Sequence, residues 1–510
     1  MTANRQELPL PIRLTAHDRL QLEIKTELLS PGSTNEKAAW CVDLWFVLPQ
    51  ATGIAPGSYQ SKEFYEDLRC YTRLKTPVVP LQELVRPDGL GSPLAPLNML
   101  AHRAQGGRLT QSEQRTLLQE SKLLSAVLKS QLRDWFSAQA TLKPNALRAK
   151  AAELEDMLGS LVASWRGLRA ELDSQNLPER CRDVLSYTDE SLSIQVETAA
   201  LDQILQLPED MRDGEVSLKL KALADAERQH RLERGWRSLV DGKNRGSDYI
   251  DQARLIKKYV SSVLHLHLRT ARWDWVARQG VPAFAAGLAM FWAVAAQLAM
   301  FLALDMQLQR GVSLGFIGTF SVLAVAAYIL KDRIKANTVS ALNRRLPAVL
   351  SDRRNDLFMP ELDEPVGRVS ERMSFERSSE MPEDVQAMRT ASARAHLLLL
   401  APQDVLRYTR QIDLKPRLAA TLFPRIDGIS DILRLNVWRW IRTYARARKE
   451  IPYVDQRGDV QRRKLDNLYF VDVIVRFQRL SPSPATHLGH FRLALNRRGL
   501  VGVEEVAQTA

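Results

Sequence analysis

The sequence has few cysteines, and nothing groups them. Cys41, Cys70 and Cys181 lie far apart among 510 residues, and none belongs to a CxxC pair or a Cys/His cluster. An odd number of unpatterned cysteines excludes a disulfide scaffold and the common zinc motifs. We therefore predict three reduced thiols that pack as small apolar side chains.

Motifs that bind phosphate or perform catalysis are also absent. The chain has no Walker A loop, no dinucleotide-binding glycine pattern, and no HExxH, GxSxG or kinase set. The histidine pairs His265/His267 and His487/His490 have no third ligand nearby. The sequence therefore supplies no candidate catalytic residue, no cofactor and no metal site, and it leaves open whether the protein is an enzyme.

What the sequence does contain is two long runs without charge. Residues 281–304 give 24 uncharged residues (VPAFAAGLAMFWAVAAQLAMFLAL), and residues 311–330 give 20. About 20 helical residues cross a hydrocarbon core of roughly 30 Å. Both runs are apolar on all sides, and only Asp305–Arg310 joins them. We therefore predict a transmembrane helical hairpin over 281–330, which makes this a two-pass membrane protein.

Basic residues flank this predicted hairpin on both sides. Residues 251–278 carry a net charge of +4 and residues 331–354 one of +5, whereas the joining loop is neutral. The positive-inside rule then places both flanks, and with them both termini, in the cytoplasm. We expect an integral protein of a bacterial inner membrane, with the lipid bilayer as its first partner. The residues predicted to orient it are Arg269, Arg272, Arg278, Lys331, Arg333 and Lys335.

The N-terminal half divides into two predicted cytosolic parts. Residues 1–96 are predicted to form an α+β region, with a β-hairpin over 12–48 and a Pro-rich linker over 77–96. Residues 110–280 are predicted to form a helical bundle or coiled-coil stalk, which opens with a capping box at Thr110 and Glu113. A heptad seam follows, and it serves either self-association or packing within one chain. Its members are Leu147, Leu154, Leu158, Leu161, Trp165, Leu168 and Leu172.

Two more parts are predicted after the hairpin. Residues 331–385 are assigned to a juxtamembrane helix and a linker, and residues 386–510 to a cytosolic α+β domain. The predicted fold class is thus an α+β membrane protein. It combines the two-helix transmembrane hairpin, the helical-bundle or coiled-coil part, and small β-containing regions near both chain ends. Whether these two β regions pair is left open.

The stretch Arg434–Lys464 is strongly basic, with ten Lys or Arg and three acids. A helix is predicted over 428–449, with one apolar arc and four basic residues opposite, namely Arg439, Arg442, Arg446 and Lys449. These four are candidate contacts to anionic lipid headgroups or to nucleic-acid phosphates, or they form the solvated face of a packed helix. A membrane tether favours lipid over nucleic acid.

Three functions remain open at this point. The first hypothesis is a membrane-anchored scaffold, sensor or assembly factor that acts through protein contacts or self-association of its helices. The alternatives are a membrane-tethered enzyme acting on a cytosolic or lipid-linked substrate, and an oligomeric pore-forming effector.

Overall fold

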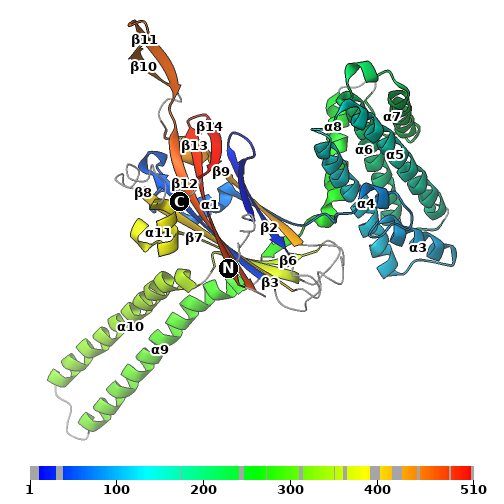
Figure 1. The fold of residues 1–510 in the computed structure, drawn as a ribbon. Helices are drawn as coiled ribbons and strands as arrows, with labels where there is room; N and C mark the ends of the chain where they lie inside the picture. Colours follow the sequence, from blue (N-terminus) through cyan, green and yellow to red (C-terminus); the bar gives the residue numbers. More distant parts are fainter. Residues whose placement is uncertain are drawn as a thin grey trace, which may run out of the picture.

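A large antiparallel sheet forms the centre of the molecule (Figure 1). The computed structural model holds twelve α-helices and fourteen strands in three sheets within the residues that it describes. This overturns the predicted fold class, because the strands are not small regions at the chain ends. The described residues are 11–29, 38–173, 175–239, 246–270, 273–308, 314–349, 351–359, 365–390, 403–415, 428–444, 448–481 and 484–506.

The central sheet has eight strands in the order β14-β13-β12-β3-β8-β7-β6-β5. Each neighbouring pair is antiparallel. In chain order its strands are β3 (Ala38–Pro49), β5 (His267–Thr270), β6 (Arg353–Phe358), β7 (Pro365–Glu376), β8 (Gln403–Leu414), β12 (Tyr469–Ser481), β13 (Ala485–Asn496) and β14 (Gly499–Glu505).

The middle of this sheet forms because β3 is apolar on both faces. Its sequence AAWCVDLWFVLP is rich in aromatic and β-branched residues, which favour strands. Trp40 and Phe46 are buried on one face in the main core, and Trp45 is buried on the other face. Phe46 pairs with Val473 of β12 and with Leu406 of β8, so β3 lies between two strands from the C-terminal part of the chain.

A four-stranded sheet, ordered β1-β2-β9-β4, packs beside the first. Strand β9 pairs with β2 on one side and with β4 on the other, again joining the two halves of the sequence. The question left open by the sequence is thereby settled, because the terminal β regions do pair. The strands are β1 (Ile12–Ala16), β2 (Gln21–Leu29), β4 (Leu68–Leu74) and β9 (Gly428–Asn436).

Short helices cover these sheets. Trp440 in α14 (Trp438–Ile441) packs edge-on against Phe46, with 5.4 Å between the ring centroids. The other short helices are α1 (Ser61–Asp67), α2 (Leu81–Leu84) and α11 (Glu383–Thr390). The residues predicted to form a Pro-rich linker therefore include a helix, α2, with Leu81 and Leu84 in the core.

Six further helices gather on one side of the sheets (Figure 1). The predicted capping box is confirmed at the start of the second of these helices, where Thr110 Oγ1 accepts from the Glu113 backbone N–H at 3.3 Å. The helices are α3 (Leu94–Gln105), α4 (Gln111–Ala138), α5 (Pro144–Asp173), α6 (Glu179–Gln206), α7 (Glu215–Glu233) and α8 (Gly246–Ser261).

The predicted coiled coil is wrong. The seam of α5 is buried inside its own chain, where Leu154, Leu158 and Trp165 belong to the same core as residues of α4 and α6. Heptad spacing places apolar side chains on one face of a helix but does not specify what covers that face. Helices of the same chain cover it here, so no seam is left for a coiled-coil partner.

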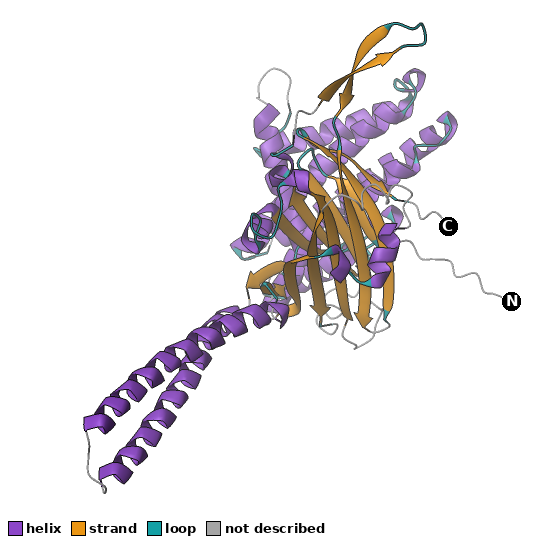
Figure 2. Cartoon of the chain, turned by 90° about the vertical axis from the view of Figure 1, so that its left-hand side faces the viewer, coloured by secondary structure: helices purple, strands orange, loops and turns teal. Residues whose placement is uncertain are grey.

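Helices α9 (Trp273–Leu308) and α10 (Leu314–Val349) lie side by side and extend away from the body (Figures 1 and 2). Strand β5 precedes α9 and strand β6 follows α10, and these two strands pair. The chain therefore leaves the central sheet through α9 and returns to the same sheet after α10. Strand β5 also interrupts the part of the chain, residues 110–280, that was predicted to be entirely helical.

The prediction of a two-pass membrane protein is also wrong. Among the described residues, one helical window is long and apolar enough to cross a membrane, Pro282–Leu302 in α9, with a mean hydropathy of 1.8. Only 17 residues of α10, from Leu314 to Leu330, precede Lys331. This is at the lower limit for a bilayer core, and within the described residues no window of α10 passes the test that α9 passes.

Two predictions of local structure fail for the same reason. Residues 331–385, predicted as a juxtamembrane helix and a linker, contain β6 and β7, and the helix predicted over 428–449 is mostly strand. Leu433 and Leu435 of β9 are buried between β2 and β4. Pairing with strands that are distant in sequence determines the secondary structure of both segments. Local periodicity does not reveal such pairing.

The third sheet is a ribbon of two strands, β10 (Arg448–Val454) and β11 (Val460–Asp466). It projects from the body in a direction different from that of the helices α3–α8 (Figure 1). All fourteen strand residues are exposed.

Candidate functional site

The largest exposed apolar surface of the described chain lies on α9. Phe291 is 75% exposed, and Phe284, Met290, Leu298 and Phe301 are each at least 60% exposed. Only 11% of the apolar window of this helix is buried within the molecule. Contiguous apolar surface of this kind marks a membrane or protein interaction site.

The predicted basic flanks lie at the base of α9 and on α10. Arg269 in β5 stacks on the ring of Phe358, with its guanidinium carbon 4.5 Å from the centroid. Lys331 lies over the ring of Tyr328 at 4.1 Å, and Arg333 and Lys335 are exposed on α10. Of the other two, Arg278 belongs to α9 and Arg272 lies outside the described residues.

Of the four basic residues predicted to share a helical face, the three that the structure describes do not share one. Arg439 in α14 is bound to Glu66 at 2.8 Å and to Asp67 at 3.2 Å, so its charge is already paired. Arg442 is exposed beyond α14, Lys449 is exposed on β10, and Arg446 lies outside the described residues. They therefore do not form one anion-binding face.

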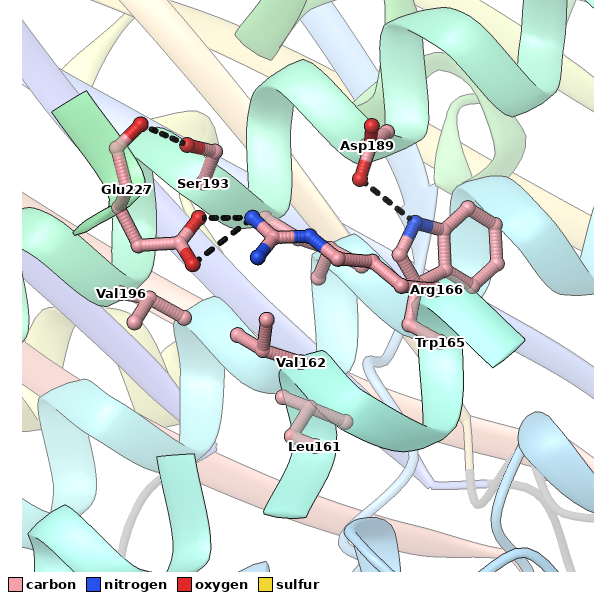
Figure 3. A pocket seen from close by; sticks show the side chains of 9 residues that line it. Leu161, Val162, Trp165, Arg166, Asp189, Ser193, Val196 and Glu227 are labelled. Carbon is pink, nitrogen blue, oxygen red and sulfur yellow. Dashed lines mark hydrogen bonds and ion pairs between the residues drawn. The ribbon is translucent and has the colours of Figure 1, made fainter. Parts of the chain in front are cut away.

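A buried ionic network joins α5, α6 and α7, and it has no counterpart in the sequence predictions. Asp189 of α6 accepts a hydrogen bond from Trp165 Nε1 at 3.0 Å, and Arg166 donates to both carboxylate oxygens of Glu227 at 2.8 Å (Figure 3). The hydroxyl of Ser193 donates to the Glu227 backbone carbonyl at 3.1 Å. These contacts fix the three helices against each other.

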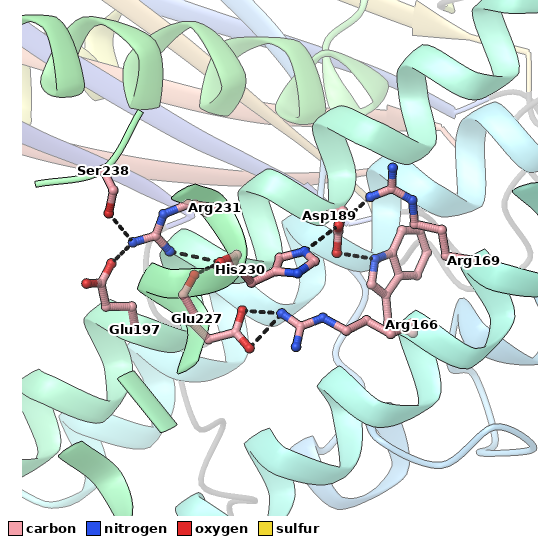
Figure 4. Close-up of polar contacts among 10 residues, drawn as sticks. Arg166, Arg169, Asp189, Glu197, Glu227, His230, Arg231 and Ser238 are labelled. Carbon is pink, nitrogen blue, oxygen red and sulfur yellow. Dashed lines mark hydrogen bonds and ion pairs between the residues drawn. The ribbon is translucent and has the colours of Figure 1, made fainter. Parts of the chain in front are cut away.

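The network continues along α7 (Figure 4). Asp189 also binds Arg169, and it lies 3.0 Å from Nε2 of His230. Arg231, which is fully buried, binds Glu197 and donates to Ser193 at 2.8 Å. Buried charges remain stable only when they are paired and hydrogen-bonded, and both conditions hold here.

The space inside this network is too small for a substrate. A cavity of about 10 Å³ lies among Leu161, Val162, Trp165 and Val196, which is room for about one water molecule. The Nε atom of Arg166 is buried without a partner and is the donor that such a water would satisfy. The arrangement is suited to holding helices together rather than to converting a ligand.

A second buried network joins the two large sheets. Arg410 of β8 is fully buried and binds Asp431 of β9 at 2.7 Å as well as Glu371 of β7. Tyr408 donates to the same Glu371 carboxylate at 2.6 Å. Burial raises the pKa of Glu371, but the Arg410 charge and these hydrogen bonds lower it by a larger amount. The net shift of the pKa is therefore downward. Glu371 therefore remains an anion that binds the sheets together.

The cysteines are free, as expected from the sequence. Burial raises the pKa of the Cys41 thiol to about 12 and raises that of Cys70 as well. A thiol nucleophile needs the opposite shift, because the thiolate is the reactive form. Neither group is poised for catalysis, and within the described chain no cluster of His, Cys, Asp and Glu is suited to a metal ion.

Comparison with known proteins does not assign a family. No protein-family model matches the chain, and no curated protein and no solved structure is significantly similar to it. The function is therefore argued from the geometry alone. Sequence periodicity found Trp165 but not Asp189, Glu227 or Arg231, since a charged residue in a helix carries no local signal of burial.

Proposed function

We propose that this protein is a membrane-anchored scaffold that presents its sheets and helices on one side of a bilayer. The observation that carries the proposal is the apolar surface of α9, with Phe291 75% exposed in a helix that extends away from the body. Such a surface is stable when lipid or another protein covers it. The proposal requires that lipid covers the apolar surface of α9, and it assigns no membrane crossing to either α9 or α10.

The pairing of β5 with β6 supports a location of the body on one side. The strands that precede α9 and follow α10 belong to one sheet. The same sheet contains strands from the N- and C-terminal parts of the chain. The exposed cations Arg333 and Lys335 lie in the second half of α10, which leads into β6 of the central sheet. The positive-inside tendency then favours the cytoplasmic side, and anionic headgroups are the lipid partner that these cations suit.

The scaffold role is supported by what the rest of the molecule offers. The described charged clusters are paired with one another, and the cavity within them has room for about one water. The exposed surface available to partners includes the helical layer and the projecting ribbon.

Flotation with lipid vesicles tests the anchor. The purified chain, reconstituted from detergent into vesicles of neutral and anionic phospholipids, should float with the lipid. The variant Phe291→Asp/Leu298→Asp should stay at the bottom of the gradient, since each Asp costs about 2.5–3.5 kcal/mol in a bilayer core. Leu255→Asp, a matched change at an exposed leucine of α8, should float like the parent chain. Equal flotation of all three proteins, or none for the parent, contradicts the proposal.

A further inference from the structure

The ribbon β10–β11 has two faces of different chemistry. Strand pairing places Lys449, Ile451 and Tyr453 on the same face as Gln461, Arg463 and Leu465. On the other face, Arg448 binds Asp466 at 3.2 Å and Lys464 binds Glu450 at 3.3 Å. The face with these ion pairs also holds Arg462 and the exposed Val454 and Val460. The other face shows Ile451, Tyr453 and Leu465 beside two cations, Lys449 and Arg463, and it has no acid.

The tip of the ribbon is built to hold its shape. Asp455 accepts hydrogen bonds from the backbone N–H groups of Arg457 and Asp459 at 2.9 and 3.0 Å. Gly458 adopts φ +86°, in the region that glycine tolerates best. An isolated two-stranded ribbon is only marginally stable in water. A preformed turn combined with an uncovered apolar face indicates an element that docks onto another surface.

A complementary surface exists at the far end of α6. Leu205 is 65% exposed and Leu201 is 44% exposed one turn earlier, on either side of the exposed Asp202. Glu209 and Asp210 follow directly and are also exposed. Within the described chain none of these three acids has an ion-pair partner. We call Leu201, Asp202, Leu205, Glu209 and Asp210 the acidic corner.

We propose that the ribbon of one copy of this protein docks on the acidic corner of a second copy. Apolar side chains face apolar side chains, and Lys449 and Arg463 face Asp202 and Glu209. All fourteen strand residues of the ribbon are exposed, so the ribbon does not lie on the corner of its own chain.

The contact joins two different surfaces, so each copy has a free ribbon or corner to offer to the next. Such head-to-tail contacts produce a ring or a row of copies. This inference rests on the proposed scaffold function and names its partner as a second copy. Confinement to a membrane would strengthen it by raising the effective concentration of the chains.

Sedimentation velocity of the full chain in density-matched detergent tests this proposal. The parent chain should form assemblies larger than a monomer that grow with protein concentration and shrink with added salt. The ribbon variant Lys449→Glu/Arg463→Glu should raise the dissociation constant at least about tenfold, because like charges then meet at the contact. The exchange Glu450→Lys/Lys464→Glu, on the face that carries the ion pairs, is the matched control. This variant should assemble like the parent.

Mixing the ribbon variant with a variant of the acidic corner gives the decisive outcome. The corner variant Asp202→Lys/Glu209→Lys should also be monomeric alone, yet it keeps an intact ribbon. Mixed with the ribbon variant, which keeps an intact corner, it should form a one-to-one complex that grows no further. A monomeric parent at about 100 μM, well above what even a small interface requires, overturns the proposal, and so does unchanged assembly of the ribbon variant. Flotation is measured separately, so the anchor and the self-association can fail independently.

Discussion

Many buried charged residues of the described chain meet an opposite charge, whereas Lys129, on the surface of α4, meets a like charge. Desolvation, together with the ammonium of Lys257 on α8, lowers the pKa of Lys129 to about 8. Two adjacent cations without an acid between them disfavour the folded state. Arg410 illustrates the usual case, with Asp431 and Glu371 on either side.

The Lys129 site predicts a substitution that stabilises the protein. A lysine whose pKa is lower when folded binds fewer protons than in the unfolded chain between about pH 8 and pH 10.5, so stability should rise with pH across that window. Below pH 8 the lysine is charged in the folded protein, so its full destabilising effect on the folded state is present. Lys129→Met should therefore raise the free energy of unfolding at pH 7 by about 0.5 kcal/mol, a value limited by solvent screening.

Denaturant unfolding at pH 7 and pH 10 measures this effect. Lys258→Met, at an exposed lysine of the same region, is the control and should change little. The gain from Lys129→Met should shrink at the higher pH, where the lysine is already neutral. A destabilised Lys129→Met protein, or a gain that grows with pH, would show that this lysine has a favourable partner.

At the scale of single elements, local sequence rules identified several segments well. The strand predicted over 39–48 is β3, and the helix predicted from Pro144 begins there as α5. In both segments most of the residues that are buried are ones that the local spacing of apolar residues indicates. The segment 428–449 shows the opposite case, since its apolar residues also fit a helical arc. Its pairing with β2 and β4, hundreds of residues away in sequence, decides that most of it is strand.

The start of α4 allows a test of such a local rule. Thr110→Ala removes the side chain that accepts from Glu113 N–H and also the hydroxyl that donates to the Glu113 carboxylate at 2.9 Å. The expected cost is about 1 kcal/mol of folding free energy. Thr116→Ala, within the same helix, should be neutral or slightly stabilising, because alanine is the better helix former. Thermal unfolding compares the two, and equal melting temperatures would mean that the cap contributes nothing.

At the scale of the whole molecule, the sequence located α9 but not the sheet that carries it. Charge-free length is a property of a segment and can be read directly from its residues. The central sheet depends on pairings between segments from both ends of the chain, such as β3 with β12 and β8. The buried networks of Asp189 and Arg410 depend on the same long-range packing, so no local pattern predicts them.

Three parts of the molecule extend from its central sheets in different directions. Helices α9 and α10 extend one way, the helical layer α3–α8 lies on a second side, and the ribbon projects on a third (Figures 1 and 2). A ribbon that points away from the apolar end of α9 is poorly placed to contact the same bilayer. This geometry favours our proposals that the ribbon contacts protein and that α9 contacts the membrane.

The most direct test of this account is the environment of α9 in vesicle-bound protein. Spin labels at Phe284→Cys, Phe291→Cys and Leu298→Cys can be probed for collision with oxygen, which concentrates in lipid, and with a water-soluble nickel complex. The account predicts high oxygen and low nickel accessibility at all three sites, and the reverse at Leu255→Cys on α8. Nickel accessibility along α9 equal to that at residue 255 would contradict it.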